Sequence, residues 1–146
     1  MKEYIGKIES HGFYIGDVCY VLDSKSYDEV WGEKYDYQDG EIPTDNNSFL
    51  VHGTAYGDGE YFDQYGHSYG VDAGVIGVVP EELISKEKLE EYKKYNHTID
   101  TLGRYVEGKT AEMYYQDGEF EIIIDNKVFT IPTGFEEEYE EDEEEW

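Results

Sequence analysis

Cysteine is almost missing from the sequence, and long apolar runs are missing altogether. Cys19 is the only cysteine in 146 residues, which excludes an intrachain disulfide framework and a zinc site built from several thiolates. No window approaches the roughly twenty apolar residues of a membrane span. The charged N-terminal segment also lacks the apolar stretch of about seven to fifteen residues that a signal peptide needs. We therefore expect a cytoplasmic protein with no membrane partner.

Positive charge is scarce as well. Eleven Lys and Arg stand against 36 Asp and Glu, which leaves a formal net charge of -25. Because contacts to phosphate need Lys and Arg, this balance argues against direct binding of nucleic acid, and an anionic lipid surface would repel the chain. The chain still contains 38% hydrophobic and 16% aromatic residues, enough apolar material for a folded core.

The apolar patterns predict an α+β fold that is mainly β. Both faces of residues 13–22 are apolar, which predicts a central strand, and further strands are expected at 48–55 and 73–79. Residues 111–131 predict a three-stranded antiparallel meander at the C-terminal end of the domain. One helix is expected to pack on the sheet.

Aspartate-glycine pairs supply the positive φ angles of tight turns. Asp117-Gly118 separates the first two strands of the meander, and Asp125-Asn126 separates the last two. Two further pairs, Asp39-Gly40 and Asp58-Gly59, also lie between aromatic segments and predict two more hairpins.

The helix is expected at about 80–95, in one of two forms. Pro80 could occupy its first position, with acidic residues at the N-terminal end and lysines at the C-terminal end. Alternatively, a short turn precedes a helix capped by Ser85, with Ile84 and Leu89 in contact across the cap. In both forms Leu89 and Tyr92 are expected to face the sheet, and Tyr95 is a further candidate for this face.

The last residues differ in kind from the rest. Residues 136–145 contain nine acidic groups, and a like-charge block of this density stays extended. Subtracting these nine leaves 27 acidic against 11 basic residues, so the remainder still carries -16. We expect a single β-rich domain over 1–134 and a disordered acidic tail over 135–146.

Acidic and aromatic residues gather between positions 29 and 63, and on one side of a sheet they would imitate the charge of a nucleic acid. Aromatic side chains would anchor the contact, although a place in the core is nearly as good an interpretation of Trp31. The candidate partner-binding residues are Glu29, Trp31, Glu33, Tyr35, Asp36, Tyr37, Asp39, Glu41, Asp45, Asp58, Glu60 and Asp63.

Other chemistries have weaker patterns. No segment completes a helix-loop-helix calcium loop, although Asp58, Glu60 and Asp63 could form a non-standard calcium site. A small-ligand or metal site would use Asp17, Asp58 and Asp72. A transition-metal site would need two distant histidines, His52 and His67, with Asp72.

Catalysis would need a desolvated carboxylate at Asp17 or Asp72, or a nucleophile at Cys19. Structural roles explain these residues better: Asp17 can bond the backbone at a bulge, and a single cysteine is commonly a small buried apolar residue. We expect no catalytic residue, no metal and no cofactor.

Three segments together resemble a group of small uncharacterised proteins of bacteria and their phages. They are residues 14–20 (YIGDVCY), 52–59 (HGTAYGDG) and 71–77 (VDAGVIG), with Val18 where the group has proline. The resemblance covers about residues 13–84 and implies no established activity. It implies a phage or mobile-element origin and a bacterial host cytoplasm. By analogy with acidic proteins of that origin, it favours a decoy for host DNA-binding machinery, including restriction and CRISPR effectors.

The charge and the aromatic content predict a protein that acts by binding. The expected partner is a basic, nucleic-acid-binding protein whose binding surface is occupied and thereby inhibited. The alternative is a ligand-binding β-domain built on Asp17, Asp58 and Asp72.

Overall fold

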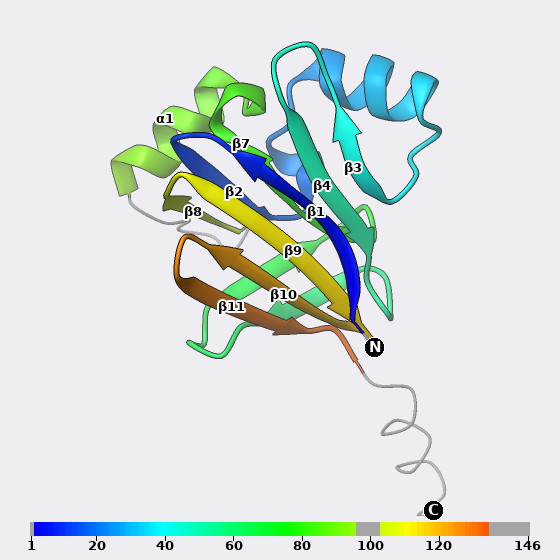
Figure 1. The fold of residues 1–146 in the computed structure, drawn as a ribbon, viewed down its shortest axis with the longest axis vertical. Helices are drawn as coiled ribbons and strands as arrows, with labels where there is room; N and C mark the ends of the chain where they lie inside the picture. Colours follow the sequence, from blue (N-terminus) through cyan, green and yellow to red (C-terminus); the bar gives the residue numbers. More distant parts are fainter. Residues whose placement is uncertain (1, 96–102, 135–146) are drawn as a thin grey trace, which may run out of the picture.

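A computed structural model describes residues 2–95 and 103–134 of the chain. This part of the molecule is mainly β, with antiparallel sheets and helices on one side, which confirms the predicted fold class (Figure 1). The predicted acidic tail lies outside the described residues.

The front layer in Figure 1 is a four-stranded antiparallel sheet in the order β1-β9-β10-β11. Its strands are β1 (Glu3–Glu9), β9 (Thr110–Gln116), β10 (Glu119–Ile124) and β11 (Lys127–Pro132). The last three form the predicted meander, with the positive-φ residues Asp117 and Asp125 in its two turns. The meander prediction is therefore confirmed.

The middle layer is a five-stranded antiparallel sheet in the order β3-β4-β7-β2-β8. Its strands are β3 (Gly40–Pro43), β4 (Ser48–Gly53), β7 (Val75–Pro80), β2 (Gly12–Gly16) and β8 (Arg104–Glu107). A separate ribbon pairs β5 (Gly59–Phe62) with β6 (Ser68–Val71). The predicted strands at 48–55 and 73–79 correspond to β4 and β7.

Two apolar cores lie on opposite faces of the middle sheet. Phe13 and Ile15 of β2 enter the core against the front sheet, whereas Tyr14, between them, enters the core under the helices. All five residues of β2 are buried, and β2 pairs with β7 on one side and β8 on the other. The expected central strand is confirmed, and its two apolar faces serve two cores.

The helices cover the second core. They are η1 (Val18–Tyr20), the π-helix η2 (Lys25–Lys34), η3 (Glu81–Leu83) and α1 (Lys86–Tyr95). The second form of the predicted helix is the one observed: η3 is the short turn, and α1 begins after Ser85. Leu89 and the buried Tyr92 pack into this core, whereas the side chain of Tyr95 lies outside the described part.

Three local predictions were wrong. The strand expected at 13–22 ends at Gly16, because the Asp17 carboxylate caps η1 by accepting from the Cys19 N–H at 2.9 Å. Asp39-Gly40 joins a helix, not a strand, to β3, so no hairpin forms there. Asp58-Gly59 stands at the start of β5, whose hairpin partner β6 follows a turn at 63–67.

A side chain covers the open edge of β11. The Gln64 amide donates to the Val128 carbonyl and accepts from the Thr130 N–H, both at 2.8 Å. These two bonds copy the pairing of a neighbouring strand. Gln64 therefore occupies two backbone groups through which an exposed edge would otherwise recruit another strand.

Candidate interaction surface

Most of the acidic residues that were predicted to bind a partner lie on one continuous helix-turn-strand unit. Residues 23–45 form η2, the turn at 35–39, β3 and the loop after it, and they carry eight acidic and two basic residues, a net -6. Seven of the eight are exposed, and we call them the acidic surface: Asp28, Glu29, Glu33, Asp36, Asp39, Glu41 and Asp45. These residues lie on a helix, a turn, a strand and the loop after it, and not on one side of a sheet as the sequence predicted.

Five of these carboxylates have no counter-ion. Within residues 2–95 and 103–134, no side-chain hydrogen bond or ion pair is made by Asp28, Glu29, Glu33, Asp36 or Glu41. Asp45 lies 3.5 Å from the Lys25 ammonium, a pair that is exposed and therefore weak. The surface consequently presents fixed, uncompensated negative charge to solvent.

A buried aromatic group supports the acidic surface from below. Trp31 of η2 is 2% exposed, packs edge-on against Phe49 of β4, and donates its indole N–H to the Gln38 carbonyl at 2.8 Å. Trp31 therefore belongs to the core, and its prediction as a partner-binding anchor was wrong. Tyr27, Val30 and Trp31 follow a helical spacing that could have revealed η2 in the sequence.

Tyr37 is the exposed aromatic residue of this surface. It is 51% exposed and lies 5.1 Å from the Trp31 ring in an edge-to-face arrangement. A Cβ at Gly32 would stand 2.7 Å from the Tyr37 hydroxyl, so only glycine allows this approach. Asp36 and Tyr37 both have positive φ, 55° and 57°, a conformation that costs about 1–2 kcal/mol per residue. Tyr35, by contrast, is half-buried against the core.

A hollow of about 490 Å³ opens beside the acidic surface, between η2 and the loop that joins β3 to β4. Its lining residues are Asp23, Lys25, Ser26, Val30, Thr44, Asp45 and Asn46. The side chains that reach it are mainly polar and carry both signs of charge.

The segment after β4 contributes less than predicted. Asp58 and Glu60 are exposed, but they lie on the loop and ribbon of β5 and not on the helix-turn-strand unit. Asp63 is buried, so its prediction as a partner-binding residue was wrong. Its Oδ1 accepts from the N–H groups of Tyr65 and His67 at 2.9 and 3.0 Å. A calcium site that uses Asp63 is equally unsupported.

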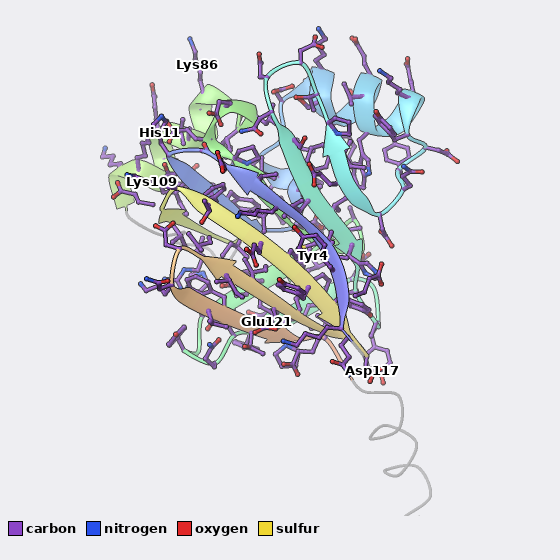
Figure 2. The ribbon with its side chains drawn as sticks, viewed as in Figure 1. Tyr4, His11, Lys86, Lys109, Asp117 and Glu121 are labelled. Atoms are coloured by element: carbon purple, nitrogen blue, oxygen red, sulfur yellow. The ribbon has the colours of Figure 1, made fainter. Side chains whose placement is uncertain are left out.

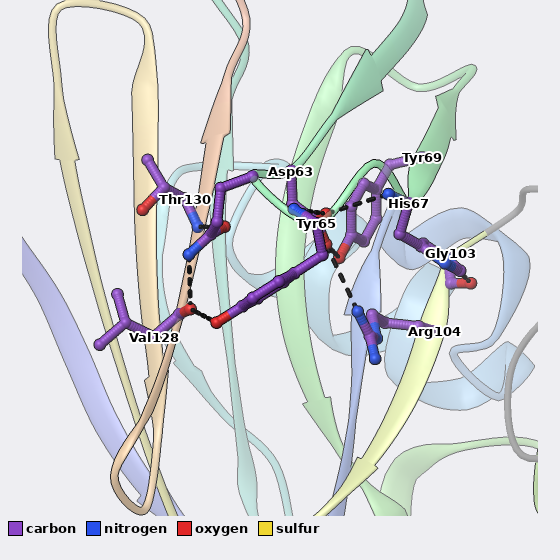
Figure 3. A network of polar contacts seen from close by, with 9 residues as sticks. Asp63, Tyr65, His67, Tyr69, Gly103, Arg104, Val128 and Thr130 are labelled. Atoms are coloured by element: carbon purple, nitrogen blue, oxygen red, sulfur yellow. Dashed lines mark hydrogen bonds and ion pairs between the residues drawn. The ribbon is translucent and has the colours of Figure 1, made fainter.

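Asp63 instead anchors a buried polar network (Figure 3). Its Oδ2 accepts from the Tyr69 hydroxyl at 2.7 Å and pairs with the Arg104 guanidinium at 3.4 Å. Burial, then the hydrogen bond to Asp63, raises the pKa of Tyr69 well above its ordinary value. The Arg104 guanidinium also stacks 5.0 Å over Phe129 of β11. The network ties the β5–β6 ribbon to both sheets.

Asp17 has a structural role as well. Its carboxylate is fully buried, with Oδ1 on the Cys19 N–H and Oδ2 on the N–H groups of Asp72 and Ala73 at 2.7 and 2.6 Å. Asp72 in turn accepts from the Tyr20 hydroxyl at 2.7 Å. Because both oxygens of Asp17 are engaged by the backbone, its carboxylate joins two loops, and the ligand site with Asp58 is not supported.

Cys19 is poorly suited to catalysis. Burial, and then the neighbouring Asp17 carboxylate, raises the pKa of its thiol to about 12. At neutral pH the thiol is protonated and therefore a weak nucleophile. His52 and His67 stand on different elements: the His52 ring stacks on Tyr115 at 3.9 Å, and His67 contacts the Gly103 carbonyl at 3.0 Å.

Neither a metal centre nor a membrane-spanning helix is present in the described part of the chain. Within the described ranges, no three His, Cys, Asp or Glu side chains are grouped so that they could hold a metal ion. In the same ranges, every helix is too short or too polar to cross a bilayer. No protein family matches the chain, and no curated protein or solved structure is significantly similar to it. The acidic surface is therefore the best candidate site on geometric grounds.

Proposed function

We propose that the protein acts by binding, and that its acidic surface occupies a basic, nucleic-acid-binding surface of another protein and inhibits it. The observation that supports this proposal is the set of carboxylates without a counter-ion on the acidic surface: Asp28, Glu29, Glu33, Asp36 and Glu41. A basic groove that normally holds phosphates would supply the missing positive charge.

The supporting structure makes this surface suitable for recognition. Trp31 and Phe49 hold η2 against β4, so the carboxylates on η2 have a fixed spacing before a partner arrives. Preorganised groups bind more tightly because less conformational entropy is lost on association. Charge mainly sets the rate and selectivity of association, and Tyr37 adds a half-exposed aromatic contact in the middle of the charges.

The experiment compares two variants of equal net charge. The surface variant combines Glu29→Gln, Glu33→Gln, Asp36→Asn and Glu41→Gln, and the control combines Glu9→Gln, Glu87→Gln, Glu90→Gln and Glu107→Gln at other exposed positions. Four neutralised carboxylates bring each net charge from -25 to -21. Both serve as bait in a bacterial host lysate, and each captured protein is tested for binding its own nucleic acid.

We expect the wild type and the control to displace nucleic acid from the captured protein, and the surface variant to lose this displacement. Raised salt should weaken capture, because the contact is electrostatic. If captured proteins bind nucleic acid and this protein at the same time, mimicry is wrong. If the control loses as much as the surface variant, the acidic surface is not the site. A chain ending at 134 tests the acidic tail separately.

A further inference from the structure

A second, smaller hollow of about 250 Å³ lies on the front sheet, at the turn between β9 and β10. Its lining residues are Lys2, Tyr114, Tyr115, Gln116, Asp117, Glu119 and Glu121. Figure 2 places Asp117 and Glu121 near this end of the sheet and His11 and Lys109 at the opposite end. Three carboxylates against one ammonium give the lining a net charge of -2.

The Tyr114 ring is held in place in this hollow. Its hydroxyl donates to the Glu112 carboxylate at 2.9 Å, and its ring packs against Tyr4 at 5.3 Å. Tyr4 and Tyr114 are directly opposite each other on β1 and β9, and Glu121 is opposite Tyr114 on β10. An aromatic face and a carboxylate thus stand side by side on neighbouring strands.

The chain itself shows which chemical group fits there. The Lys2 ammonium lies 5.5 Å from the centre of the Tyr114 ring and forms an ion pair with Glu121. An ammonium over an aromatic face is attracted by the ring, and the adjacent carboxylate adds a charged hydrogen bond. Lys2 is about half exposed, so it can leave without opening the core.

We propose that this hollow binds an alkylammonium group, from a free polyamine or a lysine side chain, which takes the place of Lys2 on Tyr114 and Glu121. The remaining carboxylates, Asp117 and Glu119, then favour a second positive charge on the same ligand. An anionic ligand would meet a net negative lining, and a neutral one would gain neither contact. The acidic surface takes no part in this site.

The test is an NMR titration of the full chain at about 0.15 M salt, where diffuse ion binding is screened. The probes are spermidine, N-acetyl-lysine methylamide and, as a neutral control of similar shape, N-acetyl-norleucine methylamide. Tyr114→Leu removes the ring, whereas Tyr114→Phe keeps it. Glu121→Gln is matched by Glu41→Gln, an equal charge change on the acidic surface. Thermal unfolding establishes that each variant is folded.

We expect shifts to be centred on Lys2, Tyr114 and Glu121. Tyr114→Leu should weaken binding about fivefold, the size of a cation–π contact, and Tyr114→Phe should bind nearly as well as the wild type. Lys2→Ala should strengthen binding by removing the competing ammonium. Binding of the lysine analogue would identify a protein side chain as the source of the ammonium group. Binding of spermidine alone would identify a free polyamine as its source.

Four results would overturn the proposal. The first two are that the norleucine analogue binds as well as the lysine analogue, or that neither amine binds. The third is that Glu41→Gln weakens amine binding as much as Glu121→Gln does. The fourth is that Lys2→Ala leaves the affinity for the amine unchanged. The last variant is at an exposed position near the N-terminus, so it remains informative even if Tyr114→Leu fails to fold.

Discussion

Replacing Asp63 by Ala should be among the most destabilising single changes in this molecule. The substitution leaves the Arg104 guanidinium, whose side chain is 22% exposed, without its counter-charge. It also removes the acceptor of the Tyr69 hydroxyl and of two backbone N–H groups, at Tyr65 and His67. Breaking a buried ion pair costs about 3–5 kcal/mol, and total stabilities are about 5–15 kcal/mol.

The converse change, Arg104→Met, should cost less. The Asp63 carboxylate would keep three of its four partners, the Tyr69 hydroxyl and the two backbone N–H groups. The Arg104 Nε is already buried without a hydrogen-bond partner among the described residues, so its removal also ends an unfavourable desolvation. The double variant should therefore cost clearly less than the sum of the two single changes.

Chemical denaturation followed by circular dichroism measures these free energies of unfolding, and thermal denaturation measures the Tm. At about 3 °C per kcal/mol for a chain of this size, Asp63→Ala should lower the Tm by about 9–15 °C. The reasoning is wrong if Asp63→Ala costs less than about 1 kcal/mol, or if the two single changes add. Glu60→Ala, an exposed carboxylate on the same ribbon, is the control and should change stability by less than about 0.5 kcal/mol.

Three further changes test other contacts. Because the pKa of Tyr69 is raised in the fold, the stability that Tyr69 contributes is present below pH 10 and is lost as the pH rises above 10. Tyr69→Phe should therefore flatten the alkaline loss of stability in denaturation curves measured at different pH. An unchanged slope would contradict the role given to Tyr69. Cys19, with a pKa of about 12, should react with iodoacetamide at pH 8 more than about a hundredfold more slowly than free cysteine; a similar rate would contradict the raised pKa of this half-buried thiol. Gln64→Ala should uncover the β11 edge and increase self-association in analytical ultracentrifugation, whereas Gln38→Ala, on an exposed turn, should not.

The sequence predicted local pairing well and longer-range placement poorly. The meander was predictable because its strands are joined by two-residue turns, so neighbouring residues decide the register. The strand at 13–22 was predicted too long because its apolar pattern continues through η1. The Asp17 carboxylate turns the chain there by accepting from the nearby Cys19 N–H and from the distant N–H groups of Asp72 and Ala73, and the distant contacts leave no periodic signal.

Acidic residues divide into two kinds that composition cannot separate. Asp17 and Asp63 are buried and accept hydrogen bonds from backbone N–H groups, whereas Glu29 and Glu33 are exposed to solvent without partners. From the sequence alone, Asp63 and Glu29 are equal candidates. The sequence could predict that the acidity is not confined to the last residues, but only the fold identifies which charges a partner could meet.

The exposed charge of the protein is less dense than that of the nucleic acid it would replace, so the two should differ in how many counterions they condense. In water, two unit charges interact with an energy of RT at a separation of about 7 Å. Duplex DNA carries one charge per roughly 1.7 Å and so condenses counterions, whose release drives protein binding and makes it steeply salt-dependent. The acidic surface spreads seven carboxylates over a helix, a turn and a strand, with Lys25 and Lys34 among them, so it condenses far fewer ions.

The affinity of a partner for this protein should therefore fall less steeply with salt than the affinity of the same partner for DNA. Titrating one captured partner with both ligands over about 0.05–0.5 M salt gives the two slopes of log K against log salt. A shallower slope for the protein means that its advantage as a competitor grows as salt rises. Equal slopes would mean that the acidic surface behaves as a dense polyanion, which its spacing and its two lysines argue against.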